Sequence, residues 1–143
     1  MPIVNVQVDL NVPIDKVWQK LVLLENYPKF MDPVKSITVL KNDGDYAEVE
    51  WEVLLKGSIL KWVEKEIKKP SEYLIEFSQI SGDLEKFDGY WSLEPLNSTQ
   101  TRARLYTDFE IGIPMLKDML DPVAEKALME NSRKMLLSFG SEI

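Results

Sequence analysis

Apolar residues near the C-terminus recur at steps of three and four, which is the spacing of one face of an amphipathic α-helix. Asp121 suits the N-cap of a helix and Pro122 suits its first turn. We therefore expect a short helical lead-in, then a long helix from Pro122 to Phe139 that ends at Gly140. At 1.5 Å per residue this helix measures roughly 27 Å, which is enough to cross a small sheet.

Most of the remaining chain alternates between apolar and polar residues, as half-buried β-strands do. Pro13 instead opens a helix that ends at Asn26-Tyr27-Pro28, and Tyr27 to Met31 predicts a second short helical turn. Turn sequences such as Asn42-Asp43-Gly44 separate the later strands and favour hairpins. The predicted strands are Ile3–Leu10, Ser36–Lys41, Tyr46–Leu55, Ile59–Ile67, Tyr73–Ile80, Leu84–Leu93 and Thr101–Ile111.

The order of these elements predicts the fold class. Strands at roughly ten-residue spacing, joined by short turns, are typical of an antiparallel meander. A long helix with one apolar face needs a sheet against which to bury it. We expect an α+β fold in which a curved, seven-stranded antiparallel sheet wraps around the C-terminal helix, with residues 1–143 forming a single domain.

Composition narrows the possible functions. The 143 residues are 45% hydrophobic and carry a net charge of −7, which argues against binding to nucleic acid or anionic membranes. The chain has no cysteine and no histidine, so thiolate nucleophiles, imidazole bases and His-ligated zinc are excluded, and we expect no metal and no cofactor. We recognise no signal peptide and no apolar run long enough to insert into a membrane, so we expect a cytoplasmic protein.

Large aromatic residues are frequent on the predicted inward faces of the strands. They either fill the core or line a cavity, because a straight helix over a strongly curved sheet leaves space at the ends of the sheet. A flexible apolar lip is also expected before the long helix, around Met119. The candidate ligand-binding residues are Trp51, Trp62, Phe77, Phe87, Trp91, Met119, Leu128 and Asn131.

Few polar groups are expected to point inward, and the weak catalytic candidates among them are Glu64, Tyr73 and Thr107. The strand Ile59–Ile67 is ambiguous, since either of its faces could be buried. If the face with Trp62 is inside, Glu64 follows it and becomes a costly buried carboxylate, with a raised pKa suited to a general base. We expect Glu66 to be solvated and leave Glu64 open.

Several local sequences resemble the START-like, helix-grip superfamily, in its polyketide cyclase/aromatase and coenzyme Q-binding branch. The resemblance covers essentially the whole chain, and its most specific part is the segment 82–95. The segments that carry it are Asn11-Val12-Pro13 with Val17-Trp18, Glu25-Asn26-Tyr27-Pro28-Lys29-Phe30, Leu60-Lys61-Trp62-Val63, Gly82-Asp83-Leu84-Glu85-Lys86-Phe87, Gly89-Tyr90-Trp91-Ser92-Leu93-Glu94-Pro95, Thr101-Arg102 and Phe109.

The resemblance implies a cavity for a hydrophobic small molecule such as a polyketide, quinone or lipid. In the aromatase/cyclases, such a cavity folds a poly-β-ketone delivered by an acyl carrier protein and promotes aldol closure and dehydration. Those cyclases often carry an arginine where this sequence has Ser58, with Lys61 the nearest cation. A tyrosine used by those enzymes is replaced by Pro33-Val34.

Three hypotheses remain at this stage. The first is a cofactor-independent enzyme similar to a polyketide cyclase/dehydratase. The second is a non-catalytic lipid- or quinone-binding carrier of the same fold, with an almost wholly apolar pocket. The third is an interaction domain with a filled core.

Overall fold

The computed structural model describes residues 3–55, 57–110 and 121–143. Its strands are β1 (Ile3–Leu10), β2 (Val34–Asp43), β3 (Tyr46–Leu55), β4 (Ser58–Lys69), β5 (Leu74–Gly82), β6 (Lys86–Asn97) and β7 (Gln100–Glu110). Its α-helices are α1 (Ile14–Val22), α2 (Tyr27–Phe30) and α3 (Asp121–Leu137), and 3₁₀ turns lie at Leu24–Asn26 and Pro70–Glu72.

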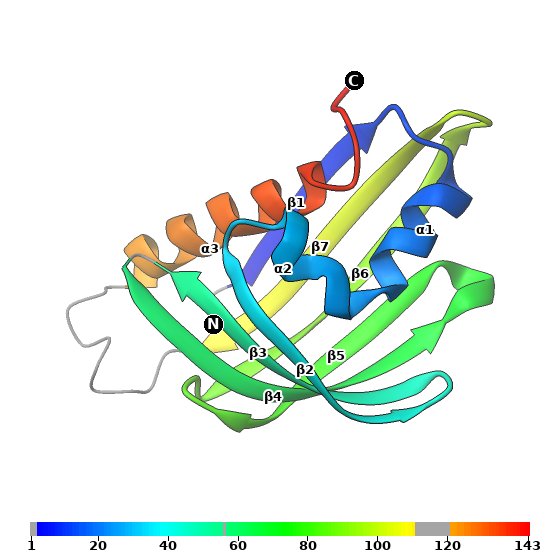
Figure 1. Ribbon diagram of the computed structural model, residues 1–143. Coiled ribbons are helices and arrows are strands. Elements are labelled where there is room, and N and C mark those ends of the chain that lie inside the picture. The colour runs from blue at the N-terminus through cyan, green and yellow to red at the C-terminus, as the bar shows by residue number, and fades with distance from the viewer. Residues whose placement is uncertain (1–2, 56, 111–120) are drawn as a thin grey trace.

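The seven strands form one antiparallel sheet in the order β1-β7-β6-β5-β4-β3-β2. Figure 1 shows the sheet curving beneath α3, with α1 and α2 towards the other end of the same side. Helix α3 packs mainly on β1, while α1 contacts β6 and β7, and α2 contacts β2. The α+β helix-grip fold expected from the sequence is confirmed.

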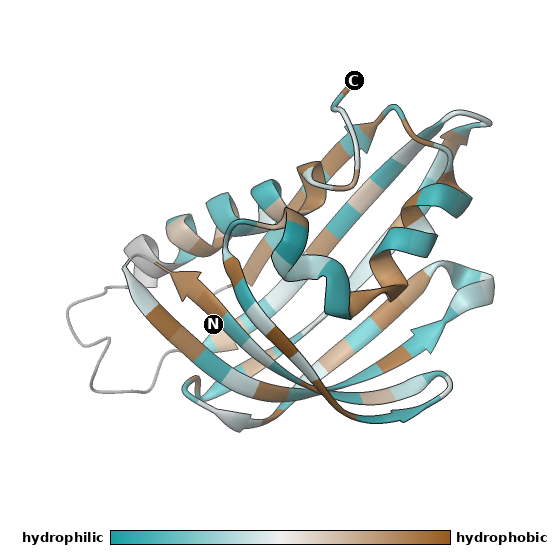
Figure 2. Ribbon diagram, viewed as in Figure 1, coloured by the Kyte–Doolittle hydropathy of each residue, from teal (hydrophilic) through white to brown (hydrophobic). Residues whose placement is uncertain are grey.

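The two-residue alternation predicted for the strands is seen clearly in β1, β3 and β7, where every second side chain is buried. Figure 2 shows the same alternation as bands of hydrophobic and hydrophilic residues along the ribbons. Each fully buried large apolar side chain contributes about 1.5–3 kcal/mol relative to an exposed one. The sheet and its three helices are therefore held together chiefly by the apolar residues of the concave face.

Helix α1 begins where the sequence predicted but ends at Val22, before the expected end at Asn26-Tyr27-Pro28, and the 3₁₀ turn Leu24–Asn26 follows it. Helix α3 ends at Leu137, two residues earlier than expected, although Phe139 beyond it is fully buried. Gly140 follows, where an added Cβ would lie 2.2 Å from Cγ2 of Val12. This close approach explains why the chain has glycine there. The predicted helical lead-in lies outside the described residues.

The inward face of β4 is set by its pairing with β3. Trp51 lies opposite Trp62, and Val49 lies opposite Glu64. Cross-strand partners point to the same side of a sheet, so the residues of β4 that pair with inward-facing residues of β3 also face inward. Glu64 and Glu66 consequently point inward, and the prediction that Glu66 is solvated is wrong.

A β-bulge lies beside this part of β4. On β5, Ser81 pairs with Val63 while Gln79 pairs with Glu64, so β5 carries one extra residue there. Gly82 follows with φ of +146°, and a Cβ at this position would lie 2.4 Å from the Cβ of Trp62. Only glycine fits this backbone without displacing β4.

None of the described helices has the combination of length and apolarity that crossing a membrane requires.

Candidate functional site

A cavity lies between α3 and the concave face of the sheet. Its volume is about 40 Å³. Its lining is apolar except for four residues, and comes from β3 through β7 together with α3. The described lining residues are Trp51, Val53, Trp62, Glu64, Phe77, Phe87, Trp91, Leu105, Thr107, Leu128, Asn131, Ser132 and Met135.

Aromatic rings form much of the wall on the sheet side. The indoles of Trp51 and Trp62 are stacked, with centroids 5.8 Å apart and planes 5° from parallel. The ring of Phe87 lies 4.8 Å from Trp62 and 5.6 Å from Phe77. These rings come from strands β3 to β6, because the aromatic residues occupy alternate inward positions of neighbouring strands. Five predicted ligand-binding aromatics, including Trp91, therefore lie together along this cavity.

Two carboxyl groups lie at this aromatic wall. Glu64 is 2% exposed and Glu66 is fully buried. The Nε1 of Trp62 donates to Oε1 of Glu64 at 2.7 Å, and the Nε1 of Trp51 donates to Oε2 of Glu66 at 3.4 Å. Within the described part of the chain, the other oxygen of each carboxyl receives no hydrogen bond from a further residue, and the two carboxyl groups hydrogen-bond to each other. Glu64 also lines the cavity.

Burial raises the pKa of Glu64 well above its ordinary value of 4.5, and the neighbouring Glu66 raises that pKa further. Burial also raises the pKa of Glu66, although hydrogen bonds from Glu64 and Trp51 oppose this effect. Two adjacent buried carboxyl groups cannot both ionise easily, so one proton is retained between them. A pair with one proton contains both a proton donor and a proton acceptor.

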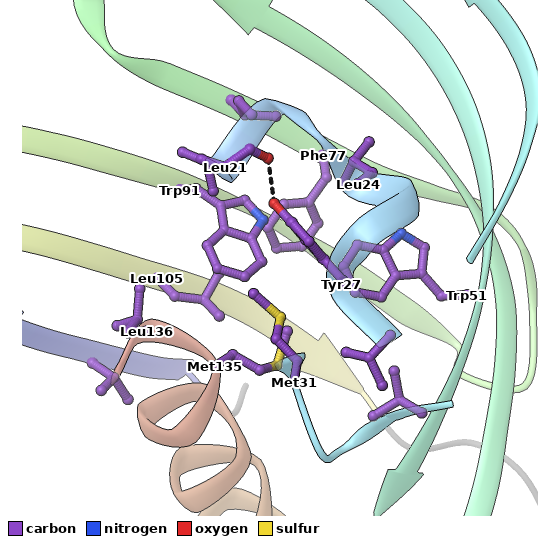
Figure 3. Close-up of a cluster of buried hydrophobic side chains, with 14 of the residues drawn as sticks. Leu21, Leu24, Tyr27, Met31, Trp51, Phe77, Trp91, Leu105, Met135 and Leu136 are labelled. Atoms are coloured by element: carbon purple, nitrogen blue, oxygen red, sulfur yellow. Dashed lines mark hydrogen bonds between the residues drawn. The ribbon is translucent and has the colours of Figure 1, made fainter. Parts of the chain in front are cut away.

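Tyr27 from α2 contributes a third titratable group. Figure 3 shows its ring among Trp51, Trp91 and Phe77, with its hydroxyl pointing to the main chain of α1. The hydroxyl donates to the carbonyl oxygen of Leu21. Burial and the charges of Glu66 and Glu64 raise the pKa of Tyr27 well above 10, so the phenol stays neutral and keeps this hydrogen bond.

The remaining polar lining groups come from β7 and α3. Thr107 is 1% exposed and Ser132 is 2% exposed, and both lie on the cavity wall. Asn131 donates from Nδ2 to the carbonyl oxygen of Leu54 at 2.8 Å, which ties α3 to the end of β3. The polar interruption of the apolar face of α3 at residues 131–132 is thus both a structural contact and part of the cavity lining.

Some predicted site residues lie elsewhere. Tyr73 was expected to point inward, but its hydroxyl donates to Oδ1 of Asp15 at 2.7 Å, and its ring packs against Trp18. Its backbone is in the left-handed region, with φ of 50°, which turns the side chain towards α1 instead of the cavity. Lys61, the cation nearest to the expected arginine position, is exposed and lies 3.8 Å from Glu50. Met119 lies outside the described residues.

The sequence did not identify three other residues at or beside the cavity. Glu66 was placed in solvent, although the indole N–H of an inward Trp51 needs an acceptor and Glu66 is one residue within reach. Met135 and Leu105 lie on the predicted apolar faces, but their sequence pattern does not distinguish a residue that lines a cavity from a residue of the filled core. No group of three or more Asp or Glu side chains suited to a metal ion occurs among the described residues.

Comparisons with known structures identify the fold. A protein from Thermus thermophilus, TTHA0849, superposes with a TM-score of 0.89 at 23% identity, covering 96% of this chain and 94% of that one. The Zhui aromatase/cyclase from Streptomyces sp. R1128 superposes with a TM-score of 0.85 at 20% sequence identity, covering 96% of this chain and 90% of that one. A START superfamily protein from Mycobacterium smegmatis superposes with a TM-score of 0.79 at 21% sequence identity, covering 95% of this chain and 94% of that one.

The sequence itself identifies the family. No curated protein matches the chain. Residues 10–136, however, match the family described as polyketide cyclase / dehydrase and lipid transport, and this range includes every described lining residue of the cavity. The chain therefore belongs to the polyketide cyclase / dehydrase and lipid transport family.

Proposed function

We propose that this protein is a cofactor-independent cyclase/dehydratase that acts on a poly-β-ketone or similar hydrophobic ligand in the cavity between the sheet and α3. The observation that carries the proposal is Glu64, a buried carboxyl group in an otherwise largely apolar wall. An unused carboxyl at such a position is costly, because burial disfavours its charged form.

The proposed reaction needs only proton transfers and correct folding of the substrate. A carboxylate of the Glu64–Glu66 pair takes a proton from a carbon between two carbonyl groups. The resulting enolate carbon attacks a distant ketone of the same chain and forms a new C–C bond, and the alkoxide takes up a proton. Loss of water and enolisation then give the aromatic ring. The balance is one water released for each ring closed.

The cavity is smaller than such a substrate. A cavity of about 40 Å³ is too small for a folded poly-β-ketone, so the proposal requires the lining residues to move apart on binding. Leu128 and Met135 line it from α3, and the flexible thioether chain of Met135 in particular changes rotamer easily. As the family resemblance implies, we propose an acyl carrier protein as the partner that delivers the chain.

A direct test is turnover of a synthetic linear tetraketone thioester, with cyclised and dehydrated products measured by mass spectrometry. We expect the protein to accelerate product formation over buffer, and Glu64→Gln to reduce the rate by about 10²-fold or more. The matched control is Glu50→Gln, a carboxylate on the opposite face of the same sheet, which should keep the full rate. Turnover equal to buffer, or full activity of Glu64→Gln, would refute the enzyme.

The alternative function is a lipid or quinone carrier without turnover, and the largely apolar lining supports it. Native mass spectrometry of the protein from its own host, with organic extraction, distinguishes the two. A hydrophobic molecule retained near one-to-one would favour the carrier. Empty protein that cyclises the tetraketone would favour the enzyme.

A further inference from the structure

The buried acids of β4 also bear on which ligands the cavity accepts. Glu64 is nine-tenths buried or more, lines the cavity and has one oxygen, Oε2, that receives no hydrogen bond from any described residue apart from the neighbouring acid. The neighbouring Glu66 is hydrogen-bonded to Glu64 and is not among the described lining residues. A ligand in this cavity therefore meets the carboxyl group of Glu64, which accepts a hydrogen bond when it is ionised and can donate one when it carries the proton of the pair.

The described groups that face the pair from the cavity side carry no positive charge to balance its negative charge. The groups that face it are the indole N–H groups of Trp51 and Trp62, which are neutral, and the neutral phenol of Tyr27 from α2. Lys68, further along the same strand, interacts with Glu66 but does not line the cavity. None of the described lining residues is a lysine or an arginine.

An anionic ligand would be placed poorly here. Its charge would lose hydration, would find no cation on the described wall, and would lie near a pair that carries a negative charge of its own. A neutral ligand meets no such penalty. Its hydroxyl or enol can donate to Glu64, and its carbonyl can accept from the pair when the proton lies there.

We propose that the Glu64–Glu66 pair makes the cavity selective for neutral ligands with a hydroxyl, enol or carbonyl oxygen, and against ligands that end in a carboxylate, such as free fatty acids. This inference rests on the proposed function in one respect, namely that the cavity is the ligand site. The inference adds a ligand class to the proposed function, since it predicts binding of neutral, oxygenated polyketide-like compounds in preference to acidic lipids.

The test uses two compounds with the same bicyclic skeleton and the same hydroxyl group. These are 2-acetyl-1-naphthol, which is neutral at pH 7, and 1-hydroxy-2-naphthoate, in which a carboxylate replaces the acetyl group. Isothermal titration calorimetry at pH 7 measures both affinities, and neutral 1-aminoanthracene serves as an apolar reference probe. We expect the unmodified protein to bind the acetylnaphthol about tenfold or more tightly than the naphthoate.

Matched double variants assign the preference to the pair. Glu64→Gln/Glu66→Gln removes both buried carboxyl groups, and we expect the preference to fall below about threefold. Glu50→Gln/Glu52→Gln replaces the same number of carboxyl groups on the outer face of the sheet and should keep the full preference. Circular dichroism checks folding, and the single variant Glu64→Gln replaces the first double variant if that protein does not fold.

Each outcome decides the proposal. Equal affinities in the unmodified protein, or binding of 1-aminoanthracene without either naphthol, would overturn the selectivity and leave the cavity as a ligand site. A preference unchanged in Glu64→Gln/Glu66→Gln would overturn its assignment to the pair. If none of the three compounds binds, the cavity is not the ligand site, and the proposed function fails together with the selectivity.

Discussion

Strands β3 and β4 lie side by side and both carry glutamates at alternate positions, but they place them on opposite faces. Glu48, Glu50 and Glu52 of β3 point outward, where they meet the hydroxyls of Tyr46 and Ser36 and the ammonium of Lys61. Glu64 and Glu66 of β4 point inward.

The two strands also differ in where their aliphatic side chains lie. Strand β3 buries its valines, whereas Ile59 and Ile67 of β4 are 44% and 38% exposed. Strand β4 thus leaves apolar side chains in solvent while it buries two acids. The difference shows that pairing with neighbouring strands decides which face of a strand is buried. The acids of β4 are therefore buried although a carboxylate is more stable in water.

The largest effect is expected from breaking the backbone that supports β4. Gly82→Ala forces a Cβ to within 2.4 Å of Trp62 Cβ and strains a φ of +146°, so we expect a loss of about 2–4 kcal/mol in unfolding free energy. Urea unfolding followed by circular dichroism measures it. Gly44→Ala is the control, since it has φ of +70° with no atom within 4 Å, and should cost about 1 kcal/mol. Equal losses would show that the bulge does not hold β4 in place.

A smaller loss is expected when an inward acid loses its donor. Trp62→Phe removes the N–H that reaches Oε1 of Glu64 and leaves that buried oxygen without a donor, at a cost of about 1–3 kcal/mol. The outward counterpart is Tyr46→Phe, which removes the hydroxyl bonded to Glu48 near solvent and should change stability by less than about 0.5 kcal/mol. Similar losses of unfolding free energy in the two variants would show that the buried hydrogen bond contributes no more to stability than the exposed one.

The smallest effect is a gain in stability that depends on pH. Because the pKa of Glu64 is higher in the folded protein than its ordinary value of 4.5, the folded state binds this proton more tightly than the unfolded state. The favourable effect of that proton is fully present below about pH 4.5 and is lost as pH rises through the folded pKa. Glu64→Gln removes this dependence, so its unfolding free energy should increase relative to that of the unmodified protein as the pH rises from 4.5 to 9.

The comparison for this gain is Glu50→Gln, whose unfolding free energy should stay within about 0.5 kcal/mol of the unmodified protein at both pH values, because its carboxylate is in contact with solvent. Urea unfolding at the two pH values measures both variants. A Glu64→Gln protein whose advantage shrinks as pH rises would contradict the raised pKa.

The architecture followed from the sequence because its signals were local and repeated. Alternation in β3 and the three-to-four spacing in α3 each involve many residues, so one exception does not alter the prediction. Strand β4 lacks that redundancy. Its two faces, Leu60 with Trp62 and Ile59 with Val63, are similarly apolar, and only the pairing of Trp51 with Trp62 decides between them.

The site was predicted less completely, for related reasons. The aromatic wall could be anticipated because inward positions of well-patterned strands were known. Glu66 was assigned to solvent because isolated acids usually lie there, and the two indole N–H groups that need acceptors were not weighed. The direction of Tyr73 could not be predicted from alternation, because this residue adopts a left-handed backbone conformation just before β5.

The stacked indoles of Trp51 and Trp62 have an optical consequence. Both rings are buried and packed against each other, so they have a fixed, asymmetric environment that gives a near-ultraviolet circular dichroism signal. Both rings also line the cavity, so a molecule that enters it changes their environment and with it this signal. The protein thus carries a built-in, label-free reporter of occupancy at the place where its ligand is expected to bind.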